Sequence, residues 1–355
     1  MFIDTPGNDT TIMAEAVSLI NGAYMAVADR GYKVNLVTSG LGCDTDNIAK
    51  EVERLVKVEK VVAIIGPVCS GTTLAAAPTV NALKVPAISP TAGAIAVSAA
   101  GPYVYRTIAT VASYVNSLMD YLVPKYTGRM AMVVDDGLGA DWAGLVDKYL
   151  AAHGGNVTFR GRFLAENGTA AQVEDLVKQA MATKPGFAFF MATSAIAPEL
   201  EVAFIRTARA EDPRFPLVMP NGLDAVTKAA LQVAAANGTQ SYPLIDGIYL
   251  AGDVPTPKAN DRYRSMFGLR YMPTLDGGAQ SNTYDAMSAI IRAAQAVGHD
   301  HLSTLNKALA AKDFTFPRYA GDIGRFDANG DLAAEQQVQA FSGASGEPVP
   351  LTGTY

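Results

Sequence analysis

The sequence has few cationic clusters, few histidines and no long apolar run, and each shortage excludes a class of function. Its net charge is −6 and lysine and arginine are dispersed, so we expect no nucleic acid partner. Membrane insertion is not expected, because no apolar run reaches the roughly eighteen residues of a membrane span. The histidines, His153, His299 and His301, lack a spacing that suits a metal ion.

Recognisable enzyme motifs are also missing. Gly137-Leu138-Gly139 follows a predicted strand, but no third glycine opens the next helix, so the dinucleotide-binding fingerprint fails. There is no Gly-Lys-Ser/Thr phosphate loop and no Gly-x-Ser-x-Gly nucleophile elbow. We therefore expect no catalytic residues and no cofactor. The sequence does not predict an enzyme, although an α/β enzyme of unrecognised type stays an alternative.

What the sequence does contain is a regular alternation of strands and helices. Its 355 residues are 49% hydrophobic, enough for two globular domains. Apolar strands at 61–65, 85–89, 130–134 and 187–192 are separated by helical segments, which predicts α/β domains with parallel sheets. The alternation breaks near Thr107–Ser113 without a flexible linker, so we expect the chain to cross between domains more than once.

The stretch from Lys60 to Gly93 carries the clearest sign of a binding site. Ser70 stands at the predicted start of a helix, in the place of an N-cap, and the next strand ends in a Pro-Thr-Ala-Gly turn at 90–93. Ligands of open α/β sheets bind at the carboxyl ends of strands, and a helix N-terminus favours an anion. The stretch predicts half of a carboxylate site, although such turns occur in any α/β protein.

The two cysteines, Cys43 and Cys69, each follow a predicted strand of one βαβ unit. Such strands are usually neighbours, so the cysteines could meet in a disulfide or stay as two free thiols. A disulfide would indicate an oxidising compartment. The chain runs from Met1 directly into Asp4-Thr5-Pro6-Gly7 without a signal peptide, as expected of either a mature exported protein or a cytosolic one.

Several short segments together resemble the solute-binding proteins of branched-chain-amino-acid ABC transporters, the type I periplasmic binding proteins that include the leucine/isoleucine/valine receptors. The resemblance covers nearly the whole chain and rests on these segments in family order: GPVCSG at 66–71, ISPTAG at 88–93, YVYRT at 103–107, VVDD at 133–136, MPNG at 219–222, TYDA at 283–286 and RFDANGD at 325–331.

This resemblance implies two doubly wound parallel-sheet lobes joined by a three-segment hinge. The lobes are expected at residues 1–110 with 250–325 and residues 111–249 with 326–355. It also implies a disulfide between Cys43 and Cys69, and hence a periplasmic location. An ABC transporter permease is the implied protein partner, and the expected oligomeric state is a monomer.

The resemblance also assigns ligand-binding residues. Ser70 matches the serine that holds the ligand carboxylate, and Thr91, Ala92 and Gly93 match the turn that completes this grip. We call these four residues the anion grip. In this chain the hydroxyl residue of the turn is at a different position: Gly93 stands where the receptors have threonine, and Thr91 stands two residues earlier.

In the second lobe, Asn221 stands where amino-acid receptors have the glutamate that pairs with the ligand ammonium. An amide cannot neutralise an ammonium ion, which points to a carboxylate without an α-amino group. Asp224 is close in sequence and could substitute. Trp142, the only tryptophan, could stack on an apolar or aromatic ligand body, or could pack a helix onto the sheet.

The sequence therefore predicts an extracytoplasmic solute-binding component of an ABC importer. Its expected ligand is a small carboxylate with an apolar or aromatic body. A branched-chain or other hydrophobic amino acid is the alternative ligand, and a ligand sensor on the same fold is the alternative role.

Overall fold

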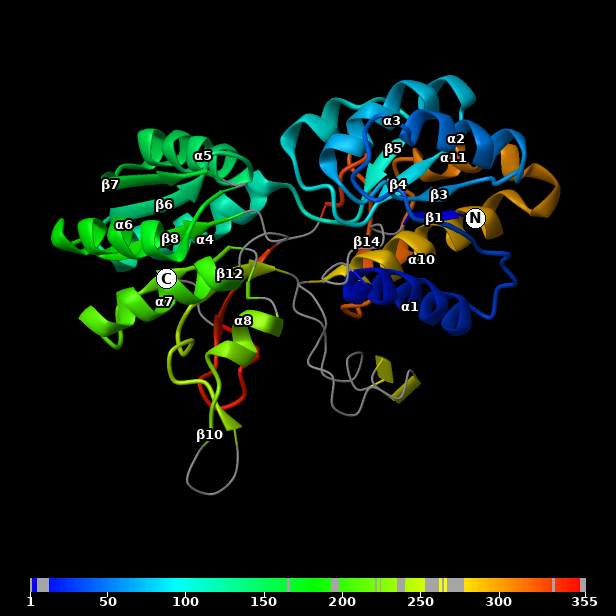
Figure 1. Ribbon diagram of the computed structural model, residues 1–355. Coiled ribbons are helices and arrows are strands. Elements are labelled where there is room, and N and C mark those ends of the chain that lie inside the picture. Colours follow the sequence, from blue (N-terminus) through cyan, green and yellow to red (C-terminus); the bar gives the residue numbers. More distant parts are fainter. Residues whose placement is uncertain are drawn as a thin grey trace. The chain divides into compact units, whose positions relative to one another are not determined.

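The computed structural model describes residues 2–4, 13–164, 167–192, 198–220, 222–223, 225–234, 240–252, 262–263, 265–266, 278–333 and 336–351. The chain divides into two compact units (Figure 1). Unit 1 comprises Met1–Val111 and Val254–Glu335, and unit 2 comprises Ala112–Asp253 and Gln336–Tyr355. The chain therefore passes between the units three times, and each unit is assembled from separate stretches of sequence.

Unit 1 is built on a five-stranded parallel sheet in the order β2-β1-β3-β4-β5. Its strands are β1 Phe2–Asp4, β2 Val37–Ser39, β3 Ile64–Ile65, β4 Ala87–Ser89 and β5 Val104–Arg106, with a separate hairpin of β13 Phe316–Pro317 and β14 Ile323–Gly324. Its helices are α1 Met13–Arg30, α2 Ile48–Lys57, α3 Ser70–Leu83, α10 Ala279–Val297 and α11 Leu305–Leu309, with 3₁₀ segments η1 Ile95–Ala99 and η2 His299–Thr304.

Alternation along the short strands gives this sheet two apolar faces. Ile65 and Ile88 belong to the core that α1 and α10 cover, whereas Ile64 and Ala87 belong to the core that α2 and α3 cover. Figure 1 shows these two helix pairs on opposite sides of the sheet. Because both faces are covered, the strands are apolar runs without polar alternation.

Unit 2 contains a seven-stranded sheet in the order β16-β15-β12-β9-β8-β6-β7, in which β12, β9, β8, β6 and β7 are parallel and β15 and β16 form an antiparallel edge. Its strands are β6 Arg129–Asp135, β7 Asn156–Phe163, β8 Phe187–Met191, β9 Leu217–Val218, β12 Tyr249–Gly252, β15 Gln337–Phe341 and β16 Pro348–Pro350, with a hairpin of β10 Val233–Ala234 and β11 Gln240–Ser241. Its helices are α4 Val111–Lys125, α5 Leu138–His153, α6 Ala170–Ala182, α7 Pro198–Glu211 and α8 Ala225–Ala230.

The prediction of two α/β lobes on parallel sheets is confirmed, with differences at the ends of elements. The strand predicted from Val61 is only Ile64–Ile65, because only these two residues pair with β1 and β4. Helix α2 begins at Ile48, because the Asp44 carboxylate accepts the N–H groups of Asp46 and Asn47 and forms a turn before the helix.

Within the described stretches, no helix has both the length and the apolar character needed to cross a bilayer. No group of three or more histidine, cysteine, aspartate or glutamate side chains gathers there in a way that could hold a metal ion.

Candidate ligand-binding site

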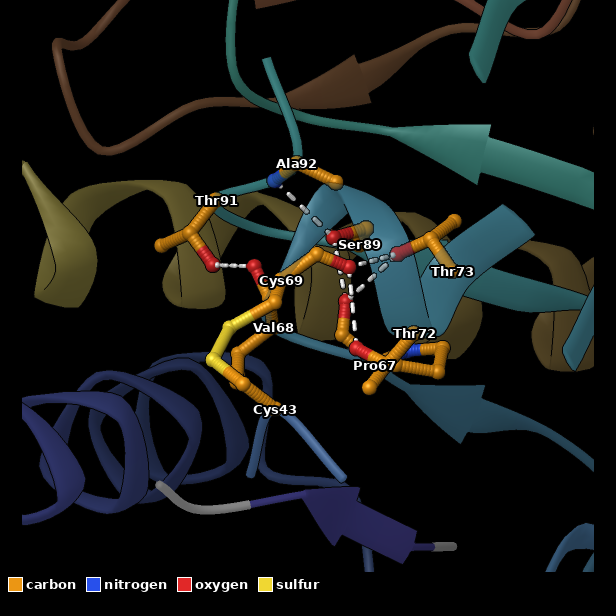
Figure 2. Close-up of a disulfide and its surroundings, with 9 residues drawn as sticks. All are labelled: Cys43, Pro67, Val68, Cys69, Thr72, Thr73, Ser89, Thr91 and Ala92. Carbon is orange, nitrogen blue, oxygen red and sulfur yellow. Dashed lines mark hydrogen bonds between the residues drawn. A yellow bond between two sulfur atoms is a disulfide. The ribbon is translucent and has the colours of Figure 1, made fainter. Parts of the chain in front are cut away.

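A disulfide joins Cys43 to Cys69, as the resemblance implies, with the two Cα atoms 5.4 Å apart. The expectation that the preceding strands are neighbours is wrong, because β1 lies between β2 and β3 in the sheet. The loop after β2 therefore reaches past the end of β1 to the start of α3. The bond fixes this loop to the first turn of α3, where the anion grip begins (Figure 2).

Helix α3 starts without a side-chain cap. Cys69, and not Ser70, is the N-cap residue, and it has extended backbone angles and no capping hydrogen bond from its side chain. Ser70 is the first helical residue and is partly buried, and its Oγ accepts the backbone N–H of Ala94 at 3.2 Å. Its own hydroxyl proton has no acceptor among the described residues. The N–H groups of Ser70, Gly71 and Thr72 have no acceptor within the helix, as in any first turn.

Hydroxyl groups fix the turn that follows β4 to the loop that precedes α3. Thr91 donates its hydroxyl proton to the carbonyl of Val68 at 2.5 Å, and Ser89 donates to the carbonyl of Pro67 at 2.5 Å. Ser89 Oγ also accepts the N–H of Ala92 at 3.1 Å. Figure 2 shows the Thr91 and Ser89 hydroxyl groups directed toward the backbone of Val68 and Pro67, and the Ala92 backbone nitrogen directed toward Ser89.

These bonds decide which donors of the anion grip are available. The Thr91 hydroxyl and the Ala92 N–H already have acceptors within unit 1, so both serve to shape the turn. Gly93 accepts the N–H of Val111 at its carbonyl, but its own N–H has no acceptor among the described residues. The Ser70 hydroxyl and the Gly93 N–H, together with the first turn of α3, are therefore the donors that could hold a carboxylate.

The corresponding helix of unit 2 is different. Asp135, at the end of β6, accepts the N–H groups of Gly137 and Gly139 at 3.1 and 2.7 Å, and it is buried. The chain's own carboxylate thus occupies the N-terminus of α5, and a second anion there would be repelled. Of these two helix starts, the one at α3 is left open to an anionic group.

Trp142 lies inside unit 2 with 1% of its surface exposed. Its ring centroid is 6.1 Å from that of Tyr114 on α4 and 6.2 Å from that of Phe189 on β8. These contacts pack α5 onto the sheet, and stacking of Trp142 on a ligand stays a prediction. Asn221 and Asp224 lie outside the described residues, so their predicted roles also stay predictions.

The sequence analysis missed Ser89 and Arg106, which support the anion grip from behind. Ser89 bridges the turn to Pro67, and Arg106 donates to the carbonyls of Ala92 and Ala94. A charged residue within an otherwise apolar extended segment was the available signal for Arg106, because a buried arginine has to find acceptors for its N–H groups.

Comparison with known proteins places the fold among solved structures. No match was found among curated proteins. Among solved structures, the chain resembles a solute-binding protein of an ABC transporter from R. palustris in complex with benzoate, at 19% identity and a TM-score of 0.77, with 99% of this chain and 94% of that chain covered. A solute-binding protein from Rhodopseudomonas palustris BisB5, in complex with 3,4-dihydroxybenzoic acid, is 17% identical with a TM-score of 0.78 over 99% and 94% of the two chains. A leucine-binding protein from Thermotoga maritima MSB8 is 18% identical with a TM-score of 0.73 over 99% and 97%.

These likenesses establish the fold, and the sequence itself establishes the family. The family model described as "Periplasmic binding protein" matches residues 10–346. That match includes the disulfide, the anion grip and nearly all of both units. The chain belongs to the periplasmic binding protein family.

Proposed function

We propose that this protein is the extracytoplasmic solute-binding component of an ABC importer and that it binds a small carboxylate with an apolar or aromatic body. The observation that carries the proposal is the uncapped start of α3, where the Ser70 hydroxyl and the Gly93 N–H have protons to donate. The capped start of α5 supports the same orientation, with the ligand carboxylate at unit 1. No covalent chemistry is proposed, and binding alone is the function.

The ligand class rests on the sequence and on the solved structures that share the fold. Two of them hold benzoate and 3,4-dihydroxybenzoate, and the third is a leucine-binding protein. Asn221 at the position of the ammonium-pairing glutamate favours an acid without an α-amino group. In this proposal Asn221 and Trp142 contact the ligand from unit 2. A hydrophobic amino acid is the second candidate ligand, because a leucine-binding protein is about equally similar.

Location and partner are part of the proposal. The Cys43–Cys69 disulfide supports an oxidising compartment, which for an importer component is the periplasm. The partner is the permease of an ABC transporter, and the protein acts as a monomer that delivers its ligand unchanged.

Mass spectrometry of the denatured purified protein identifies any ligand that it carries, and titration calorimetry then tests chosen probes. We expect benzoate and 4-hydroxybenzoate to bind, and phenylpropionate to bind more tightly than phenylalanine. Tighter binding of phenylalanine would show that a residue other than Asn221 supplies a counter-charge. Recovery of benzoate unchanged after long incubation separates a binding protein from an enzyme.

The anion grip is tested by Ser70→Ala. A hydrogen bond to a charged group is worth about 1.5–3 kcal/mol, so the variant should bind benzoate about ten- to a hundredfold more weakly. Ser303→Ala, at an exposed serine of η2 in the same unit, is the matched control and should bind like the parent. Equal affinity of the Ser70 variant and the control would refute the grip.

A further inference from the structure

Arg106 at the end of β5 lies directly behind the anion grip. Its side chain is 0% exposed. Its Nη1 donates to the carbonyls of Ala92 and Ala94 at 3.1 and 2.7 Å. Of the guanidinium's remaining donors, Nε donates to Asp331 Oδ1 at 2.6 Å and Nη2 donates to Ser98 Oγ at 2.5 Å. Arg106 thus brings a buried positive charge to the backbone of the turn.

The bond to the Ala92 carbonyl determines where the Gly93 N–H points. The Ala92 carbonyl and the Gly93 N–H belong to one peptide group, which is planar and trans, so they point in opposite directions. Since the carbonyl is directed at the buried guanidinium, the Gly93 N–H is directed away from it. A cation on the carbonyl also polarises the peptide and strengthens its N–H as a donor.

Asp331 and Ser98 hold the guanidinium in this position. Ser98 Oγ donates to Asp331 Oδ2 at 2.7 Å, so the three side chains form a closed triangle. The backbone adds to it, because Arg106 N–H donates to the carbonyl of Gly330 at 3.0 Å and the Leu332 N–H donates to the carbonyl of Arg106 at 3.1 Å. The carboxylate neutralises the buried charge, which would otherwise be expensive to keep away from water.

We propose that Arg106, fixed by Asp331 and Ser98, is a positioning residue for ligand binding: it orients the Ala92–Gly93 peptide so that its N–H faces the ligand carboxylate. The proposal rests on the function proposed above and adds a residue that does not touch the ligand. It also makes carboxylate affinity depend on Asp331, which is distant from the grip in sequence.

The test is Arg106→Lys, measured against Arg318→Lys. Lysine keeps the charge, but it cannot donate to two carbonyls, a carboxylate and a serine at once. Arg318 is a matched control in the same unit, because it is 5% exposed, its Nε donates to buried Asp285 at 2.9 Å and its Nη1 donates to Asp322 at 3.0 Å. With benzoate as the probe, we expect about tenfold weaker binding for Arg106→Lys and binding within about twofold of the parent for Arg318→Lys.

A second measurement does not depend on any ligand. In protein labelled with isotopic glycine, the amide resonance of Gly93 should shift in Arg106→Lys and stay in place in Arg318→Lys. Ser98→Ala removes one hydrogen-bond partner each from Arg106 and Asp331. It should also weaken benzoate binding and shift the Gly93 resonance, both to a smaller extent than Arg106→Lys. This variant decides the question if Arg106→Lys does not fold.

The outcomes separate the two proposals. The positioning role is overturned if Arg106→Lys binds benzoate like the parent and its Gly93 resonance does not move. If Arg106→Lys does not fold, the same two results in Ser98→Ala overturn it. If the parent protein binds none of the tested carboxylates, the proposed function fails. The Gly93 resonance then decides the positioning role alone, with a shift upholding it and an unmoved resonance overturning it.

Discussion

Removing the disulfide should destabilise unit 1 by an amount that follows from its place in the chain. Cys43 and Cys69 are 26 residues apart in sequence. In the chain-entropy model, cross-linking a loop of that size stabilises the folded state by about 3.5 kcal/mol at 25 °C. For a unit of this size each kcal/mol corresponds to about 2–4 °C, so the variant Cys43→Ser with Cys69→Ser should melt about 7–14 °C lower.

The assay is thermal and urea unfolding of the parent and the double variant, followed by circular dichroism with and without reductant. Reductant should lower the midpoint of the parent to that of the variant and leave the variant unchanged. Thiol titration of the denatured, unreduced parent should find no free thiol. A stability loss below about 1 kcal/mol, with the fold intact, would refute the loop-closure reasoning.

Two further predictions concern single side chains. Burial raises the pKa of Tyr105 to about 12, above that of an unfolded tyrosine, so its contribution to stability is complete below about pH 10 and is lost as the pH rises toward 12. In urea unfolding, Tyr105→Phe should lose less stability than the parent between pH 10 and about pH 12. An equal loss in parent and variant would show that the raised pKa of Tyr105 does not cause the loss. Asp135→Ala removes the carboxylate that accepts the N–H groups of Gly137 and Gly139, and it should cost about 1 kcal/mol in urea unfolding followed by Trp142 fluorescence. An unchanged unfolding midpoint would show that Asp135 does not cap α5.

The layered fold could be predicted from the sequence because its parallel strands are buried on both faces. The run at Phe187–Met191 is entirely buried, and it was recognisable as an apolar stretch of strand length. The antiparallel edge formed by β15 and β16 was not predicted, since β15 is buried only at Gln339 and Phe341, and β16 has no fully buried residue and two prolines. Pairing with β12 depends on contacts between residues distant in sequence, which local pattern does not encode.

The anion grip was predicted as a set of residues but not as a set of hydrogen bonds. Sequence identifies Thr91 as a hydroxyl in the right turn, but only the folded chain shows that its proton goes to Val68. Ser70 was expected as the N-cap, yet Cys69 takes that position. No sequence signal distinguishes the two, because the extended backbone of Cys69 is held by the tertiary structure and not by its own side chain.

The division of unit 1 into two separated stretches has a consequence for the order in which the chain can fold. Its core on the α1 side needs α10 and the segment around Phe316, so that core cannot close until nearly the whole polypeptide has been synthesised. The central strands of unit 2, β6 to β9, and the helices between them are complete much earlier, within one continuous stretch. We therefore expect the unit that contains the N-terminus to be the second to form during synthesis, reversing the usual N-terminal-first order. Until then the apolar side of α1 lacks its helix partner, so every unfinished chain exposes an apolar surface that is prone to aggregation.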